Sequence, residues 1–345
     1  MISTILKTEW LKLKNYRAFW LLLAVTAISY PGINGIAYYA FMDSIDAKTQ
    51  SGQLVKMLLG NPFAFPQSFH TTAYLSSFFT FIPAIVVIML ITNEYMFKTH
   101  RQNIIDGWKK NTFIWGKFIS VLLITLIVTL FYLVVASIIG TIATPDVDRA
   151  KILEKAHYIG LFSLQVFCQL SIAFLLGLLI RKAFIAYGIY IFYSFILENI
   201  LSGFFRLKSK KWGVDYGHYL PFEISDRLIP LPPSIGKFNA ADNQLAIAAI
   251  NNHVVYTLML TAFVWLLSFY IFKKESIDII HIDGNHNEES VSKDIENYFP
   301  LIKQGGIIMM DDSDWKGVRN SIDKLLTGKT ELQISNKHLE IYIKK

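Results

Sequence analysis

Charged residues are scarce in this chain, where they make up only 17% of 345 residues. Soluble globular proteins carry about 25% charged residues, so the deficit argues against an ordinary soluble protein. Hydrophobic residues make up 53%, and the mean hydropathy is +0.40. These values are typical of a protein that lies largely within a membrane.

Cysteine is nearly absent. The single cysteine, Cys168, lies in a hydrophobic run and cannot form an intramolecular disulfide. It therefore indicates no redox compartment, and we interpret it as a small apolar residue of the core.

Acidic residues are rare in the first part of the chain. Residues 1–274 contain 13 Asp and Glu against 24 Lys and Arg, whereas residues 275–345 contain 13 against 9. Because the balance of charge changes sign there, the sequence predicts two domains of different origin, 1–274 and 275–345.

Long apolar runs are abundant in the first domain. A membrane helix needs about 20 apolar residues to cross roughly 30 Å of hydrocarbon. Six such runs predict a mainly α, polytopic membrane domain with six transmembrane helices. They are Ala18–Phe41, Thr71–Thr92, Phe118–Ala143, Tyr158–Ile180, Ala183–Phe205 and Val254–Phe272.

Basic residues predict the orientation of these spans, because they favour the cytoplasmic side in short loops. They gather before the first span, after the second, between the fourth and fifth, and after the sixth. We expect a cytoplasmic N-terminus and a cytoplasmic C-terminal tail. The segment 206–253 is also basic in its first part, but long segments can cross the membrane despite their charge.

Apolar residues recur at near-helical spacing ahead of the first span, opposite three lysines. This pattern predicts an amphipathic helix in the membrane interface. The apolar residues are Ile2, Ile5, Leu6, Trp10 and Leu13, and the lysines are Lys7, Lys12 and Lys14.

The segment after the second span reads NEYMFKTHRQNIIDGWKKNTFIWGK over residues 93–117. It predicts a short amphipathic element, Thr99–Ile105, a turn at Asp106-Gly107, and the start of the next span. A compact helix on a short tether can press into a groove of a soluble partner. An ordinary basic loop that only fixes topology is the alternative.

The residues of this segment resemble the cytoplasmic loop of ABC-2 type permeases, and Lys14–Trp20 resembles their N-terminal elbow. The resemblance covers residues 1–274. It implies that the loop binds a separate ATPase. The loop residues that carry the resemblance are Glu94, Thr99, Arg101, Gln102, Asn103, Asp106, Gly107 and Lys117.

The resemblance also implies a permease subunit of an ATP-driven exporter in the bacterial cytoplasmic membrane. We expect a homodimer or heterodimer of such membrane domains, and ATP bound by a cytoplasmic ABC ATPase partner. No nucleic-acid partner is expected. Drugs, peptides, lipids and ions all stay open as substrates.

This chain is not expected to bind ATP itself. A phosphate-binding loop needs the pattern G-x-x-x-x-G-K-[ST]. The nearest match, Gly328-Lys329-Thr330, has Asp323 where the first glycine belongs. The permease therefore lacks its own ATPase.

Glu198 is the one acid well inside a predicted span. Charges inside membranes are costly and often functional. A role in substrate or proton binding and a structural role as a hydrated or paired group both stay open.

The pattern changes to α/β after the sixth span. Apolar runs predict strands at Ile277–Ile282 and Gly306–Met310 and a final antiparallel pair at Leu332–Ser335 and Leu339–Ile343. Helices are predicted at Glu288–Phe299 and Gly317–Leu326.

Three pieces of this tail, IDGNH, PLIKQGG and IIMMDDSDW, resemble the C-terminal half of class I SAM-dependent methyltransferases, near the metal-dependent O-methyltransferases. The resemblance implies that Asp283, Asp311 and Asp312 bind a divalent metal such as Mg²⁺, and that His286 is a general base. Strand-end turn and cap residues are the alternative reading of these acids.

The first half of that methyltransferase fold, with its glycine-rich SAM loop, has no match before Ile277. We therefore expect a chimera with a seam near Phe272–Ser276 and a tail without methyltransferase activity. A natural fusion, an assembly artefact and an engineered join stay open as its origin. The competing functions are a membrane-anchored O-methyltransferase and a non-transporting membrane anchor or sensor.

Overall fold

The computed structural model describes residues 2–46, 60–99, 110–145, 151–232, 240–274 and 277–345. The chain folds as two compact units, Met1–Tyr270 and Ile271–Lys345. The first is helical and the second contains a sheet, and each is described by itself.

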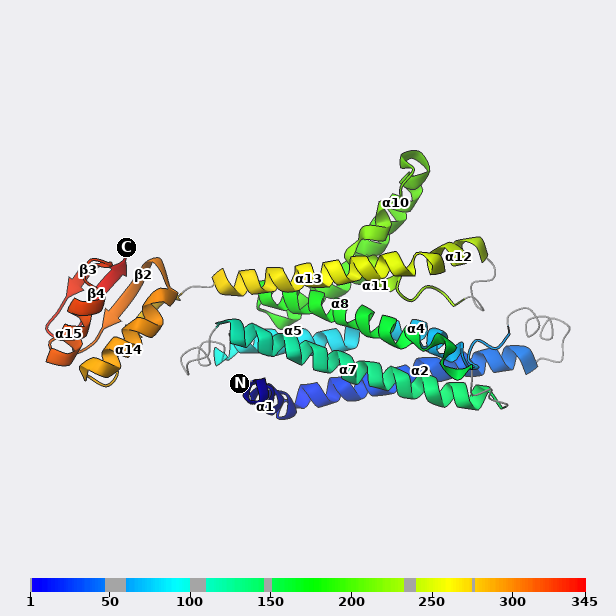
Figure 1. Ribbon diagram of the computed structural model, residues 1–345, viewed down its shortest axis with the longest axis horizontal. Helices are drawn as coiled ribbons and strands as arrows, with labels where there is room; N and C mark the ends of the chain where they lie inside the picture. The colour runs from blue at the N-terminus through cyan, green and yellow to red at the C-terminus, as the bar shows by residue number, and fades with distance from the viewer. Residues whose placement is uncertain (1, 47–59, 100–109, 146–150, 233–239, 275–276) are drawn as a thin grey trace. The chain divides into compact units, whose positions relative to one another are not determined.

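Long apolar helices make up the first unit (Figure 1). Among the described residues, five are long and apolar enough to cross a membrane, and a bent pair of helices, counted as one span, brings the number to six. The prediction of six spans is confirmed. They are α2 (Arg17–Asp46), α4 (Ser68–Ser77) with α5 (Phe81–Met96), α7 (Lys110–Ala143), α8 (His157–Ile180), α9 (Ala183–Phe192) with α10 (Glu198–Trp212), and α13 (Ile250–Lys274).

The second span is broken near its middle, where α4 and α5 meet at 54°. Thr80, just before α5, donates a hydrogen bond from Oγ1 to Gln169 Oε1 of α8 at 2.5 Å. A buried polar contact thus joins the two spans beside the break.

The helix α8 is central to the packing of the membrane unit. A Cβ atom on its Gly177 would lie 2.5 Å from Ile91 Cγ2, so only glycine allows α5 to approach this closely. On another side, Trp265 of α13 stacks on Phe174 with ring centroids 4.9 Å apart and donates to Ser171 Oγ at 2.9 Å. These contacts fix α8 between α5 and α13.

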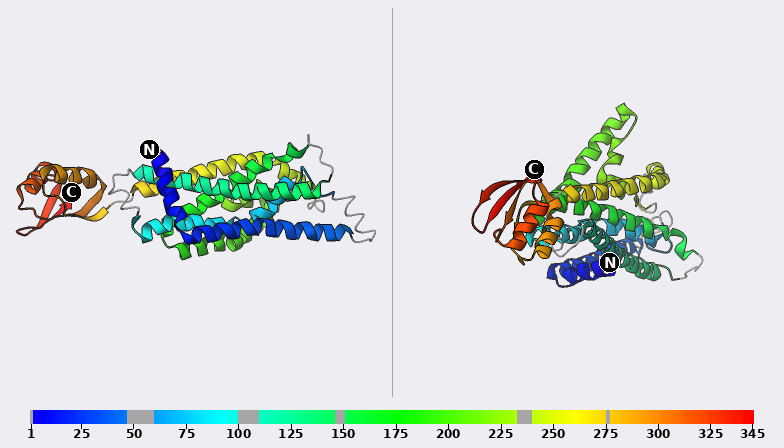
Figure 2. Two further views of the ribbon diagram at one scale, coloured as in Figure 1. Left: turned by 90° about the horizontal axis from the view of Figure 1, so that it is seen from below. Right: turned by 60° about the vertical axis from the view of Figure 1, so that its left-hand side comes forward.

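The predicted N-terminal helix is confirmed as α1 (Ile2–Lys14). It runs across the direction of the spans, as the left view of Figure 2 shows. Leu13 is buried, and Trp20 Nε1 of α2 donates to Lys14 O at 2.9 Å. This helix is therefore attached to the start of the first span.

The connection between the fifth and sixth spans holds η3 (Tyr216–Tyr219), α11 (Pro221–Asp226) and α12 (Ala240–Ala248). α11 packs against the bundle, where Ile224 O accepts a hydrogen bond from Thr257 Oγ1 of α13 at 3.4 Å. Tyr190 of α9 packs edge-on against Phe222 at 5.2 Å. The connection thus folds back onto the spans.

The second unit is a four-stranded sheet with two helices, and its predicted elements are confirmed. The strand order is β1-β2-β4-β3, with β1 parallel to β2 and the other neighbours antiparallel. In chain order the elements are β1 (Ile277–Ile282), α14 (Glu288–Tyr298), η5 (Phe299–Leu301), β2 (Ile302–Met310), α15 (Lys316–Leu325), β3 (Thr330–Ser335) and β4 (Glu340–Lys344).

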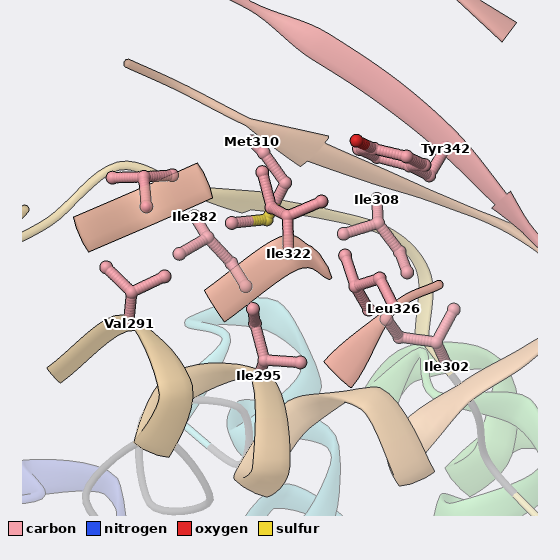
Figure 3. Packing of buried hydrophobic residues seen from close by; sticks show 10 residues of the cluster. Ile282, Val291, Ile295, Ile302, Ile308, Met310, Ile322, Leu326 and Tyr342 are labelled. Carbon is pink, nitrogen blue, oxygen red and sulfur yellow. The ribbon is translucent and has the colours of Figure 1, made fainter. Parts of the chain in front are cut away.

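Alternate residues of the strands form the core of this unit, because successive side chains point to opposite faces. Ile282, Ile308 and Tyr342 face α14 and α15, as Figure 3 shows. On the opposite face, Ile279 is 58% exposed. No described strand pairs with the outer edge of β1 or of β3, so both edges of this sheet are open among the residues described.

Candidate functional site

Four buried or half-buried charges meet at one end of the membrane unit. Lys117 of α7 lies between two carboxylates, with its Nζ 2.7 Å from Glu9 Oε2 of α1 and 2.5 Å from Glu94 Oε1 of α5. Lys12 Nζ lies 2.8 Å from the same Glu94 oxygen and 3.4 Å from Glu9 Oε1. We call Glu9, Lys12, Glu94 and Lys117 the charge cluster.

The cluster is almost closed to solvent. Glu9, Glu94 and Lys117 are 3%, 3% and 1% exposed. Isolated charges are very costly to bury, so such groups require partners of opposite sign. Two carboxylates and two amines balance one another here, and the cluster therefore holds α1, α5 and α7 together as a unit.

Two hydroxyl groups complete the cluster. Ser120 Oγ donates to Glu9 Oε2 at 3.3 Å, one helical turn after Lys117. Thr99 Oγ1 donates to Glu94 Oε2 in a short hydrogen bond. Glu94 and Thr99 precede residues 100–109 in the chain, and Lys117 follows them. Glu94 contacts Lys12 of α1 and Lys117 contacts Glu9 of α1, so α1 contacts the chain on both sides of that segment.

The sequence analysis named eight residues of this segment, and the structure places three of them, Glu94, Thr99 and Lys117, at the cluster. Glu94 and Thr99 contact each other and the cluster. Five others, Arg101, Gln102, Asn103, Asp106 and Gly107, lie outside the described residues.

Glu9 was missed by the sequence analysis, although the signal was present. It is the only acid in α1 and falls four residues before Leu13 on the face predicted to be apolar. A lone acid on such a face requires a buried partner. That partner, Lys117, is supplied by a distant part of the chain.

Glu198 begins α10, directly after η2 (Tyr193–Leu197), a π-helical turn. Its side chain is buried, and Oε1 accepts a hydrogen bond from the Glu223 backbone N–H at 2.6 Å. This contact holds α11 against the spans and supports the structural role left open for Glu198.

The predicted metal ligands of the tail fall into two groups. Asp283 and Asp311 lie together with His281, whose Nε2 is 3.8 Å from Asp311 Oδ2, and the three ligand atoms lie within 4.8 Å of one another. Asp312 belongs instead to a group with Asp314 and His338. The predicted trio is therefore divided, and the sequence analysis missed His281.

The predicted base, His286, lies beside the second group. Its Nε2 is 3.3 Å from Asp312 Oδ2, and its ring packs on Trp315 with centroids 4.8 Å apart. It makes no recorded contact with Asp283 or Asp311 among the residues described. An oxygen-rich set with one imidazole, such as the first group, suits a divalent cation.

Comparison with known protein families decides the class of the membrane unit. The profile of the ABC-2 family transporter proteins matches residues 5–197, which is more than half of the chain. The chain belongs to the ABC-2 transporter family. It is a multi-pass membrane protein, and the resemblance of its first part to ABC-2 permeases is confirmed.

A methyltransferase-domain profile matches residues 214–313, which confirms the second resemblance. This match begins within the ABC-2 membrane unit. Residues 214–274 hold η3, α11, α12 and α13, and strand structure begins only at β1. The boundary at 274/275 stays a prediction. No curated protein matches the chain.

The described tail is a mixed four-stranded sheet with two helices. Before β1 stands α13, a membrane-spanning helix, where an intact methyltransferase has its first strands and SAM loop. The residues present fit a divalent cation at His281, Asp283 and Asp311, but the described part offers no glycine-rich loop for SAM.

Proposed function

We propose that this chain is the membrane subunit of an ATP-driven exporter, which couples to a separate cytoplasmic ATPase through residues 93–117. Membership of the ABC-2 family supports a transport role. The charge cluster carries the coupling proposal, because it ties both ends of this segment to α1.

The cluster suits the transmission of motion for a physical reason. When both ends of a loop are held by ion pairs, a displacement of the loop is transmitted to the helices at its ends. Glu94 ends the second span and Lys117 lies in the first turns of the third. Movement of the ATPase against residues 100–109 would therefore act on both spans and on α1.

The proposed assembly contains two such membrane domains, identical or different, and two ATPase subunits in the bacterial cytoplasmic membrane. The excess of basic residues supports a cytoplasmic N-terminus and tail. Binding and hydrolysis of ATP on the partner would shift the spans between inward-open and outward-open states.

Purification of the tagged full-length chain from its native membranes tests this proposal. We expect an ABC ATPase to co-purify at a fixed ratio and the complex to hydrolyse ATP. Two results together would instead favour a membrane anchor or sensor. The chain would purify without an ATPase, and its membranes would show no ATP-dependent transport that requires this chain.

We also propose that the tail binds a divalent cation but transfers no methyl group. The grouping of His281, Asp283 and Asp311 supports the metal site, and the membrane helix before β1 argues against SAM binding. A membrane-anchored O-methyltransferase, the competing function, requires both ligands.

Binding of Mn²⁺ to the full-length chain, measured by electron paramagnetic resonance, tests the tail. We expect Asp283→Asn to weaken binding about tenfold or more, because it removes a charged ligand. Asp314→Asn changes an acid of the other group and is the matched control, with unchanged affinity expected. SAM binding that is lost in Asp283→Asn would contradict the proposal.

A further inference from the structure

Asp226, which ends α11, is a carboxylate of the membrane unit that forms no ion pair with a basic residue in the described part of the chain. Arg227, its neighbour in sequence, pairs instead with Glu223, with Nε and Oε2 3.0 Å apart. Ionisable groups without partners are rare within membrane domains and usually have a function.

Asp226 lies at membrane depth, although it belongs to a connection between spans. Its Oδ1 accepts hydrogen bonds from Nε2 of Gln165 at 2.8 Å and Nε2 of Gln169 at 2.7 Å. At 1.5 Å per residue, these glutamines lie about 12 and 18 Å along α8 from its first residue, His157. Both depths fall within a hydrocarbon layer of about 30 Å.

Two hydrogen-bond acceptors of this site have no donor among the residues described. No described group donates to Asp226 Oδ2, and Asp226 taken as a whole residue is exposed. Gln165 is 1% exposed, and its Oε1 has no partner among the residues described. Both free acceptors require a donor, and the negative charge of the carboxylate favours a donor with positive charge.

Two tyrosines, Tyr74 of α4 and Tyr190 of α9, lie near enough to Asp226 for its charge to act on their hydroxyl groups. Phe222 packs against Tyr190 at an interplanar angle of 78°. Aromatic faces attract organic cations, so these side chains favour an organic cation beside the carboxylate.

We propose that Asp226, with Gln165 beside it, binds the protonated amine of the transported substrate. The substrate class is therefore an organic ammonium ion that carries at least one N–H and an apolar or aromatic body. This inference rests on the transport function proposed above and adds the substrate class to it. The amine donates to Asp226 Oδ2 and Gln165 Oε1, and the aromatic side chains contact the body.

Calorimetry on the purified full-length chain, without an ATPase, tests the site with phenethylammonium as the probe. We expect Asp226→Asn to weaken binding about tenfold or more, since a charge-assisted hydrogen bond is lost. Phenethyltrimethylammonium has the same charge but no N–H, and it should bind more weakly than the primary amine. Asp215→Asn, another acid of the same connection, is the control and should bind as the wild type does.

Equal binding by the wild type and Asp226→Asn would overturn the proposal, as would no measurable binding by the wild type. Equal affinity for the two cations would overturn the part that requires an N–H donor. If Asp226→Asn does not fold, Gln165→Leu removes the free acceptor alone and should weaken phenethylammonium several-fold; an unchanged affinity would again overturn the proposal. The calorimetry uses the chain without an ATPase. Its outcome therefore does not depend on whether residues 93–117 couple to one.

Discussion

Replacement of Lys117 by methionine is expected to destabilise the membrane unit severely. Methionine keeps the length of the side chain but removes the amine that lies between Glu9 and Glu94. Only Lys12 then remains for two buried carboxylates, and its own side chain is 32% exposed. Loss of one partner from a buried ion pair costs about 3–5 kcal/mol, so the melting temperature in detergent should fall by several degrees.

Two variants make this measurement specific. Lys14→Met removes the same charge at an exposed position of α1 and should leave the melting temperature nearly unchanged. The double variant Lys117→Met with Glu9→Gln removes one of the unbalanced carboxylates and should recover part of the loss. If Lys117→Met melts within a degree of the wild type, the cluster does not hold α1, α5 and α7 together.

Scrambling Arg101–Gly107 is expected to abolish ATP hydrolysis by the purified complex. A permuted order keeps the composition and the charge of this segment but destroys the face that would fit a groove on the ATPase. The charge cluster lies outside the permuted residues, so the chain should still fold. Hydrolysis and co-purification of the ATPase are the two measurements, and both should drop to background.

A scramble of 233–239 is the matched control, because it has the same length and lies in the connection between the fifth and sixth spans. We expect it to keep the ATPase and its hydrolysis rate. Unchanged hydrolysis after the Arg101–Gly107 scramble, with normal folding, would show that the contact lies elsewhere.

Hydropathy alone could predict the spans, because each is a long apolar run and needs no partner to be recognised. It could not predict the break at Phe78–Thr80. The sequence there, FFTFIP, is continuously apolar apart from Thr80, whose partner Gln169 lies far along the chain. A window of mean hydropathy does not register a bend. The sequence signal for it is Pro83, which has no backbone N–H to donate to Phe79 O.

The charge cluster and the metal-ligand candidates of the tail could likewise be predicted only in part from the sequence. Glu94 could be predicted from its place at the end of a span, but Glu9 acquires its role only when α1 folds against α7. In the tail, Asp311 and Asp312 are adjacent, and Asp312 adopts a left-handed backbone with φ at 48°. Their carboxylates therefore join different groups. His281 and Asp283 lie two residues apart, the spacing that places strand side chains on one face.

A single-cysteine cross-linking experiment tests the central claim most directly. The only native cysteine, Cys168, is buried and can be replaced by alanine before Gln102→Cys or Asn239→Cys is introduced in separate variants. A short bifunctional reagent should link the chain to the ATPase from position 102 and not from position 239. A link from position 239, or no link from 102 in a complex that still hydrolyses ATP, would contradict coupling through residues 93–117.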